Sequence, residues 1–373
     1  MRERIGGSSL HVCIRSHRMH VQRLEAYMGT SEDYERRHHR KQSTAVTSHD
    51  VALAAGVSQA TVARTFSSPD LVASETKARV LEAAERLAYI PNAMARTLKS
   101  QRSRIVGVVV PSEGEYYQHV LTELTAQLSA AGEQLLLFTF SGTDDIDDVI
   151  ASVLSYQVDG VMVASSAINV QQIQRIVSSG VPVVSFNQPA ATGLSPSVVA
   201  DNAAGMEKLA EYLVDTGHRS VIFIGGVAAA PTDQERYQSA VRTLSDHDVL
   251  CRYFEAGAYT YRAGLNAAAH LIEEPRLPDA VMVAADEIAL GVIDGLRAKG
   301  ISVPGDLSVT GFDGLPQAEW LAYDLTTVSL PITEMVKHTV DLLGPDTPES
   351  DEIVVPGTLR KGTTVKTRND ERV

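Results

Sequence analysis

Gln59, Ala60, Thr61 and Arg64 bring together an amide, a methyl group, a hydroxyl and a guanidinium within six residues. An arginine can donate two parallel hydrogen bonds to a guanine, whereas small and polar side chains contact neighbouring bases or phosphates. We expect Arg64 to reach a guanine edge, Gln59 and Ala60 to select neighbouring bases, and Thr61 to be shared between a base and a phosphate. This chemistry requires all four side chains to lie on the exposed face of one element.

Two short helices joined by a glycine turn are predicted to hold these residues. Thr47 can cap the first helix, and Gly56 follows the last residue of its apolar face, where a positive φ is needed. Ser58 can cap the second helix, which runs through Phe66. The residues predicted to face inward are Val51, Ala54, Ala55, Val57, Val62 and Phe66. This is a helix-turn-helix pattern, although any pair of short helices with a glycine turn can produce it by chance.

A third helix that starts at Ser74 and Glu75 is predicted to close a three-helix core. Its apolar positions are Val80, Ala84, Leu87 and Ala88. The whole stretch resembles the DNA-binding headpiece of the LacI/GalR (lactose-repressor) family. The matching residues are Val51-Ala52, Ala55-Gly56-Val57-Ser58, Thr61-Val62, Arg64, Val80, Ala84, Leu87, Tyr89, Pro91-Asn92, Ala95-Arg96 and Leu98. The resemblance implies a headpiece over residues 43–91 that also contacts DNA through Thr47 and Ser58, and a homodimer on a palindromic double-stranded operator, since one headpiece contributes one half-site.

Residues 92–104 join the headpiece to the rest of the chain. A helix of about seven residues would be marginal here without a partner. The resemblance implies a hinge helix that forms on the operator, contacts DNA through Asn92, Ala95 and Arg96, and inserts Leu98 into the minor groove. An apolar wedge between base steps kinks DNA. The alternative is a flexible basic linker in which Leu98 only packs.

The formal net charge of −13 is unevenly distributed over the 373 residues. Residues 1–42 have nine Lys and Arg against five Asp and Glu, and residues 43–104 have eight against five, so residues 105–373 have a net charge of −20. A basic front and an acidic body suit a protein whose front contacts phosphate. Residues 1–42 lack apolar periodicity, and we expect a disordered extension. It is either a basic arm for DNA, or a solvated extension, or a product of assigning the start before Met19 or Met28.

Two cysteines, Cys13 and Cys251, form no disulfide or metal-site spacing, which indicates a reducing compartment. The histidines near the start, including His38 and His39, have no second ligand pair, so we expect no metal and no cofactor. No apolar run is long enough to span a membrane, and no secretion signal is evident. We therefore expect a cytoplasmic protein without a membrane partner.

From residue 105 onward, short apolar runs alternate with helical segments. The runs lie at residues 105–110, 134–140, 159–164, 181–186, 220–225, 280–284 and 307–312. Helices are expected near 116–131, 145–155 and 287–299. Continuous apolar strands alternating with helices predict an α/β fold with parallel sheets that are covered on both faces.

Ligands of such sheets bind beyond the carboxyl ends of the strands. Polar and aromatic residues follow several strands, as a sugar-like ligand would require. They are Tyr116, Tyr117, Ser165, Ser166, Asn187, Asp286 and Asp313. Tyr116 and Tyr117 have an alternative role in packing at the start of a helix, and Asp286 has an alternative role in capping the next helix.

The second part of the chain again resembles the LacI/GalR family, in its effector domain. The matching motifs are ADNAAG (200–205), GHRSVIFIGG (217–226), DQERYQSA (233–240), the segment 285–314 that ends in GFDG, LTTV (325–328) and RKGTT (360–364). The resemblance implies two lobes like those of periplasmic sugar-binding proteins, lobe 1 at about 105–200 and 330–347 and lobe 2 at about 201–329 and 348–373. It assigns the effector to Arg236 and Asp313, and a guanidinium with a carboxylate can bind vicinal hydroxyls.

This sequence departs from the family pattern at Ala285, where many relatives have an amide, at Ser239-Ala240 and at residues 112–115. Motifs of serine hydrolases, P-loop proteins, dinucleotide-binding enzymes and zinc proteases are missing, so we expect no enzyme. The sequence predicts a transcriptional repressor controlled by a small-molecule effector, a carbohydrate. The alternative is a sugar-binding receptor with a vestigial DNA-binding front end.

Overall fold

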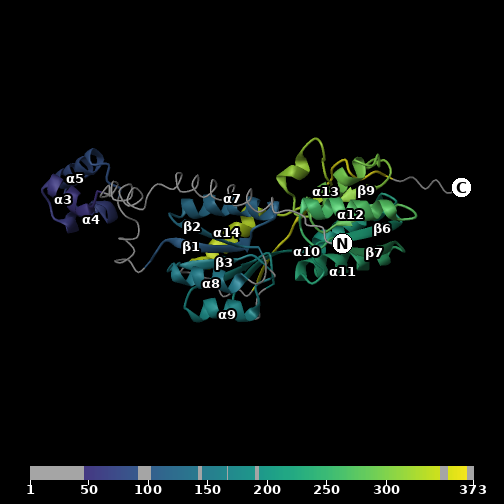
Figure 1. Cartoon of the computed structure of the whole chain (residues 1–373), viewed down its shortest axis with the longest axis horizontal. Helices are drawn as coiled ribbons and strands as arrows, with labels where there is room; N and C mark the ends of the chain where they lie inside the picture. Colours follow the sequence, from purple (N-terminus) through teal and green to yellow (C-terminus); the bar gives the residue numbers. More distant parts are fainter. Residues whose placement is uncertain are drawn as a thin grey trace, which may run out of the picture. The chain divides into compact units, whose positions relative to one another are not determined.

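The computed structural model describes residues 46–90, 102–141, 145–165, 167–189, 193–344 and 352–367. The described residues divide into two compact units, one within residues 1–96 and one within residues 97–373 (Figure 1). The expected extension at 1–42, the hinge residues Asn92, Ala95, Arg96 and Leu98, and Ser166 lie outside the described residues. No helix among the described residues is long and apolar enough to cross a membrane.

The first unit is the three-helix headpiece. Its helices are α3 (Ser48–Ala55), α4 (Gln59–Ser67) and α5 (Ser74–Arg86), with a 3₁₀ turn η1 (Pro69–Leu71) between the last two. Thr47 caps α3, because its hydroxyl accepts a bond from the Asp50 amide while the Asp50 carboxylate accepts one from the Thr47 amide at 2.8 Å. Gly56 ends α3 at a φ of 65°, and the Ser58 hydroxyl accepts the Thr61 amide at 3.1 Å to begin α4.

Two positions of the predicted headpiece core are wrong. Ala54 is exposed and Ala52 is buried in its place, since the α3 positions that face α4 and α5 are Val51, Ala52 and Ala55. Ala88 is also exposed, because α5 has ended and Ala88 adopts a left-handed φ of 50°; Ala83 fills the core instead. The buried core is Val51, Ala52, Ala55, Val62, Val80, Ala83 and Ala84.

Within the described residues, lobe 1 of the second unit is built on a six-stranded parallel sheet in the order β11-β5-β4-β3-β1-β2. The strands are β1 (Ile105–Pro111), β2 (Gln134–Phe140), β3 (Gly160–Val163), β4 (Val183–Phe186), β5 (Ser197–Ala200) and β11 (Glu352–Val355). The helices are α7 (Glu115–Ala130), α8 (Ile146–Ser155), α9 (Val170–Ser178) and α14 (Ile332–Leu343). Alternate β1 residues serve the two faces: Val108 packs with Leu124 of α7, and Val109 with Ile150 of α8.

Lobe 2 has a four-stranded parallel sheet in the order β7-β6-β8-β9. The strands are β6 (Ser220–Gly225), β7 (Leu250–Glu255), β8 (Ala280–Val283) and β9 (Ser308–Thr310). The helices are α10 (Asn202–Asp215), α11 (Pro231–Ser245), α12 (Tyr261–Glu273) and α13 (Asp286–Arg297). Helices α10 and α11 cover one face and α12 and α13 the other (Figure 1). The predicted α/β fold with parallel sheets is confirmed.

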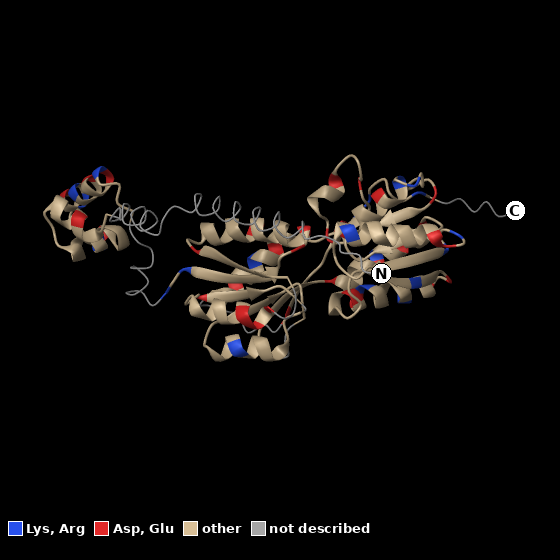
Figure 2. Cartoon of the chain, viewed as in Figure 1, with Lys and Arg blue, Asp and Glu red and all other residues tan. Residues whose placement is uncertain are grey.

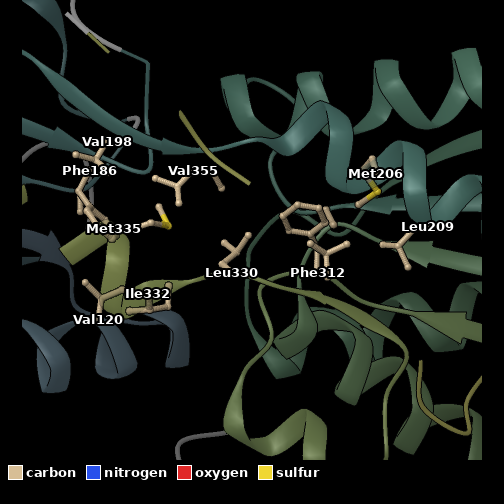
Figure 3. Close-up of a cluster of buried hydrophobic side chains, with 14 of the residues drawn as sticks. Val120, Phe186, Val198, Met206, Leu209, Phe312, Leu330, Ile332, Met335 and Val355 are labelled. Atoms are coloured by element: carbon tan, nitrogen blue, oxygen red, sulfur yellow. The ribbon is translucent and has the colours of Figure 1, made fainter. Parts of the chain in front are cut away.

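The chain crosses between the lobes three times. The first crossing follows β5, the second joins β10 (Thr327–Ser329) to α14, and the third joins β11 to β12 (Thr358–Arg360), which pairs with β10. We expected the third crossing near Pro348, but β11 pairs with β5 in the lobe 1 sheet, so this crossing comes after Val355. One hydrophobic cluster runs through the crossings from Phe186 in lobe 1 to Phe312 in lobe 2 (Figure 3).

Candidate functional site

The exposed face of α4 presents the side chains expected to contact bases. Gln59, Ala60 and Arg64 are exposed and Thr61 is half-buried, whereas Val62 and Thr65 on the opposite side are buried. The Gln59 amide donates to the Ser48 hydroxyl at 2.8 Å and so ties the starts of α3 and α4 together. The side chains of α4 are therefore presented by two helices held in a fixed register.

The described headpiece contains fewer basic than acidic residues, unlike the segments on either side of it. Residues 46–90 contain four Lys and Arg against five Asp and Glu, so the positive excess counted for residues 43–104 comes from the segment that follows, residues 91–104. Both signs are mixed over the headpiece helices (Figure 2). Arg64 is the charged residue of α4, and no acidic residue lies on that helix. The face that carries Arg64 is thus compatible with phosphate although the headpiece as a whole is not basic.

Arg236 and Asp313 meet in lobe 2, as expected. The guanidinium lies on α11, is 3% exposed, and has Nη2 3.3 Å from Oδ1 of Asp313. Its Nε donates to the Asn202 side-chain oxygen at 2.7 Å, and Nη1 donates to the Ala284 carbonyl at 2.5 Å. The guanidinium carbon also lies 4.0 Å from the centroid of the Phe312 ring. Arg236 is consequently held in one orientation by polar, ionic and aromatic contacts.

Asp313 is held by an unusual backbone. Its φ of 115° lies in a region that side-chain-bearing residues rarely adopt. Its amide donates to the Val328 carbonyl at 3.0 Å, and its carbonyl accepts the Leu330 amide at 3.1 Å. Burial raises the pKa of Asp313 to about 6, although the charge of Arg236 opposes that rise. The carboxylate thus faces Arg236 from a loop attached to the second crossing between the lobes.

Asp286 does not take the capping role that was the alternative to ligand binding. It is the first residue of α13 and its side chain makes no capping bond, so the capping alternative is wrong. Its two carboxylate oxygens accept the Thr327 hydroxyl at 2.5 Å and the Leu315 amide at 2.7 Å. Burial, with a further contribution from the charge of Asp313, raises the pKa of Asp286 to about 8. Asp286 therefore fixes the loop that carries Asp313 to β10.

The expected residues of lobe 1 include two buried oxygen atoms without a hydrogen-bond partner among the described residues, Tyr116 Oη and Asn187 Oδ1. Tyr116 and Tyr117 lie edge to face, with ring centroids 5.4 Å apart, and both also pack against the large hydrophobic cluster. Burial raises the pKa of each hydroxyl, and the charge of Asp313 adds to the rise. The packing role considered for this pair is therefore confirmed, and their contact with a ligand stays a prediction. The Tyr116 hydroxyl has no hydrogen-bond partner among the described residues.

Ser165 is buried, and its hydroxyl accepts the Ala167 amide at 3.1 Å, which places it in a local turn. Glu115 marks where the lobes meet: its amide donates to Glu287 Oε2 at 2.7 Å, and its carboxylate accepts the Gln317 side chain at 3.0 Å. Gln317 belongs to the 3₁₀ turn η2 (Pro316–Glu319). Two hydrogen bonds thus connect the first turn of α7 in lobe 1 to lobe 2.

Several residues around Arg236 were missed from the sequence. Asn202 and Phe312 contact the guanidinium directly. Asn202 lies in the motif ADNAAG and Phe312 in GFDG, and both motifs follow strands, so their positions at strand ends could have indicated them. Asp233 lies one turn before Arg236 on α11 and accepts bonds from the Gly226 amide at 2.6 Å and from two tyrosine hydroxyls at 3.1 Å. Those hydroxyls belong to Tyr253 and Tyr259, which no local pattern indicates.

Two cavities lie apart from these residues. One of about 310 Å³ lies between β7 and α12 and is lined by Arg252, His270 and Glu274 among others. The other, of about 260 Å³, adjoins Arg102 and Asp159 in lobe 1. Among the described residues, no three His, Cys, Asp or Glu side chains are grouped in a way that could hold a metal ion.

Comparison with known proteins identifies the family. Residues 47–92 match the family of bacterial regulatory proteins, lacI family, and residues 210–368 match a periplasmic binding protein-like domain. The chain is 31% identical over 303 residues to catabolite control protein A of Priestia megaterium, covering 80% of this chain and 91% of the relative. The chain belongs to the LacI family.

Other members agree with this assignment. The LacI-family chain is 30% identical over 308 residues to the HTH-type transcriptional repressor CytR of Escherichia coli strain K12, covering 82% of this chain and 90% of that protein. A lac repressor dimer bound to operator and an anti-inducer superposes with a TM-score of 0.76 at 23% identity, covering 86% of this chain and 99% of the repressor, which supports the fold. A CelR–cellobiose complex superposes with a TM-score of 0.62 at 28% identity, covering 86% and 99%. These relatives are transcriptional regulators.

Proposed function

We propose that this LacI-family protein is a dimeric repressor that binds a palindromic operator and changes its affinity when a neutral carbohydrate binds between its lobes. The assignment of a carbohydrate ligand rests on the buried Arg236–Asp313 pair, in which Nη2 and Oδ1 are 3.3 Å apart. A guanidinium and a carboxylate side by side match the acceptor and donor of neighbouring hydroxyl groups. The bound cellobiose named for the CelR relative is consistent with this ligand class.

The charges around the pair favour a neutral ligand over an anionic one. Arg236 is paired with Asp313, and Glu287 adds negative charge that Asp313 experiences. A phosphate or carboxylate on the ligand would be repelled by these groups while Arg236 is already engaged. Tyr116 Oη and Asn187 Oδ1, buried and without partners among the described residues, offer lobe 1 contacts to sugar hydroxyls. Ser165 and Tyr117 remain proposed ligand contacts beside them, as does Asp286 in lobe 2.

On the DNA side, we assign base contacts to Gln59, Ala60, Thr61 and Arg64, and backbone contacts to Thr47 and Ser58 at the helix starts. Asn92, Ala95, Arg96 and Leu98 keep their proposed roles in a hinge helix at 92–104. For the effector domain we place lobe 1 at about 105–200 and 330–355 and lobe 2 at the rest. The protein acts in the cytoplasm and is not an enzyme, as its regulator relatives suggest.

A surface of lobe 2 suits the dimer contact. Trp320 and Leu321 follow η2 and are 58% and 103% exposed, and Tyr261 and Leu265 of α12 are 38% and 37% exposed. The two segments adjoin, because Tyr261 and Tyr323 donate to the same Asp294 oxygen at 2.9 and 2.6 Å. Large exposed apolar side chains of this kind mark protein interfaces, and a second copy of the chain is the occupant we assign. Leu321→Glu should shift sedimentation toward the monomer, whereas an unchanged dimer would locate the contact elsewhere.

The experiment that tests the function is selection of DNA from a random duplex library, followed by titration of the selected duplex with neutral mono- and disaccharides and with sugar phosphates. We expect enrichment of a palindrome and a change in affinity of roughly 5- to 150-fold with one neutral sugar, the range of typical allosteric coupling. Failure to enrich any sequence would favour the sugar-binding receptor alternative. A larger response to a sugar phosphate would contradict the neutral-ligand assignment.

A further inference from the structure

The chain enters lobe 1 through a clamp made by one carboxylate. Oδ1 of Asp159 accepts both the amide and the hydroxyl of Ser103, at 2.8 and 2.9 Å, and Oδ2 accepts the Arg104 amide at 2.8 Å. The Asp159 amide in turn donates to the Ile105 carbonyl at 2.8 Å. Asp159 directly precedes β3, so it belongs to the rigid sheet, whereas Ser103 and Arg104 are the last residues before β1.

Lobe 2 contains the same device at the equivalent place. Asp279 directly precedes β8, and its Oδ2 accepts the amides of Arg219 and Ser220 at 2.8 and 3.1 Å just before and at the start of β6. Its own amide donates to the Ser220 carbonyl at 2.8 Å. In lobe 1 the Arg104 carbonyl accepts the amide of Gln134, the first residue of edge strand β2, at 2.8 Å. In lobe 2 the Arg219 carbonyl accepts the amide of Leu250, the first residue of edge strand β7, at 3.3 Å. The clamp is thus a repeated element of the two parallel sheets.

The two copies differ in what they hold. In lobe 2 the clamped residues follow α10 within the same lobe, so the clamp only joins parts of one rigid body. In lobe 1 the clamped residues follow the segment that leads from the headpiece. Arg104 is also bent into the left-handed region, with a φ of 56°, which a residue with a side chain adopts only when its surroundings impose it. Asp159 supplies those surroundings, because it binds Arg104 and the residue before it.

We propose that Asp159 is a positioning residue for DNA binding, because it fixes the point and direction at which the linker leaves lobe 1. This inference rests on the proposed function of the headpiece and linker. While Asp159 binds Ser103 and Arg104, a movement of lobe 1 moves these two residues with it. With the clamp open, Ser103 and Arg104 gain backbone freedom that must be lost again when two headpieces dock on one duplex. Asp279 makes a similar number of hydrogen bonds but has no linker to position.

The test compares Asp159→Ala with its matched control Asp279→Ala in the full chain. The first readout is amide exchange of a peptide that includes Ser103 and Arg104, and the second is affinity for the duplex selected with the wild-type protein. We expect Asp159→Ala to speed exchange at these residues and to weaken DNA binding roughly tenfold, about the entropy of one freed backbone residue. Asp279→Ala should lower thermal stability comparably and leave DNA affinity within about twofold of wild type.

Three outcomes overturn the proposal: unchanged exchange at Ser103 and Arg104 in Asp159→Ala, unchanged DNA affinity in that variant, or an equal loss of affinity in both variants. If Asp159→Ala does not fold, Ser103→Ala gives the same comparison with a smaller effect, because it keeps both backbone bonds to Asp159 and removes the hydroxyl bonds to Asp159 at 2.9 Å and from the Ile105 amide at 3.1 Å. If the wild-type protein selects no DNA, the proposed function fails, while the exchange measurement still decides whether Asp159 holds the linker.

Discussion

In the headpiece, Gln59 and Arg64 lie exposed on one helix, whereas in lobe 2 Arg236 and Asp313 are buried and come from elements 77 residues apart in sequence. The headpiece residues contact local neighbours, as Gln59 does with Ser48. Arg236, by contrast, is bound by Asn202, Ala284 and Asp313. A buried charge needs such partners to offset the loss of hydration, whereas an exposed one keeps its water.

Function and stability can therefore be changed separately in the headpiece, but not at the buried pair in lobe 2. Removing an exposed side chain of α4 changes what the headpiece contacts and leaves its core of seven small apolar residues intact. Removing a buried side chain of the Arg236 network leaves a partner unpaired in a low-dielectric environment, so binding and folding change together.

Arg236→Ala should have the largest effect. It leaves Asp313 buried without its cation, and breaking a buried pair in this way costs about 3–5 kcal/mol of unfolding free energy. Carbohydrate binding should be lost as well. The matched control is Arg252→Ala, because Arg252 pairs with Glu274 at 2.9 Å but is half exposed; its loss should cost about 1 kcal/mol or less. Chemical denaturation of both variants checks this, and equal losses would break the comparison.

The stability of lobe 2 should fall as the pH rises. Burial raises the pKa of Asp286 to about 8 and that of Asp313 to about 6, both above the ordinary value of 3.8. The folded state therefore binds more protons than the unfolded chain between about pH 4 and 8, and the stability that these two groups contribute is present below pH 4 and lost as pH rises through 6 and 8.

Asp286→Asn should flatten this dependence, above all between pH 6 and 8, because an amide does not titrate. Urea denaturation at a series of pH values measures the slope. The control is Asp341→Asn, whose carboxylate is exposed beside Lys337 at 2.7 Å and should keep the wild-type slope. A wild-type slope in Asp286→Asn would mean that another group titrates in this range.

The strands that the sequence predicted are apolar runs, and most of them are buried on both faces, although β2 at the edge of its sheet is partly exposed. The runs at 105–110, 134–140 and 220–225 have continuous apolar residues and were found within one residue of their predicted bounds. The strands that were missed are short or at an edge: β11 and β7 alternate exposed and half-buried residues and contain Glu352 and Arg252. Because β11 was not predicted, the third crossing was placed before this strand, whereas it follows it.

The site was predictable where residues follow strands, and not where bonds join distant elements. Asp313 and Asn187 could be proposed as ligand residues because they follow β9 and β4. Whether Asp286 caps a helix or binds Thr327, 41 residues away, depends on the packing of β10 beside β9 and has no local signal. The same is true of Asp159, whose partners are 55 and 56 residues earlier in the chain.

Arg64→Ala tests the headpiece side of the comparison. Arg64 is exposed on α4, so its loss should not change the unfolding free energy measurably. Binding to the selected duplex should weaken by about 1–3 kcal/mol, while binding to random DNA should change little, if Arg64 reads a guanine. Arg79→Ala on α5, which is also exposed, is the charge-matched control. Equal losses on both DNAs would reduce Arg64 to a phosphate contact.

Gln317→Ala should have the smallest effect and tests a case between the two regions. The Gln317 amide donates to Glu115 across the lobes at 3.0 Å, beside the bond from the Glu115 amide to Glu287 at 2.7 Å. These bonds are exposed like those of the headpiece, yet they join separate lobes like those of the buried network. Because the three crossings and the shared apolar cluster also hold the lobes together, removing one such bond should shift lobe closure by only about 0.5–1.5 kcal/mol.

For Gln317→Ala we expect faster amide exchange at the start of α7, with unchanged exchange in the sheet cores. Gln234→Ala, which breaks a bond to the Ala228 carbonyl at 3.1 Å inside lobe 2, should leave α7 unaffected. If both variants speed exchange there equally, the contact at Glu115 does not control closure, and the lobes are held by their buried residues alone.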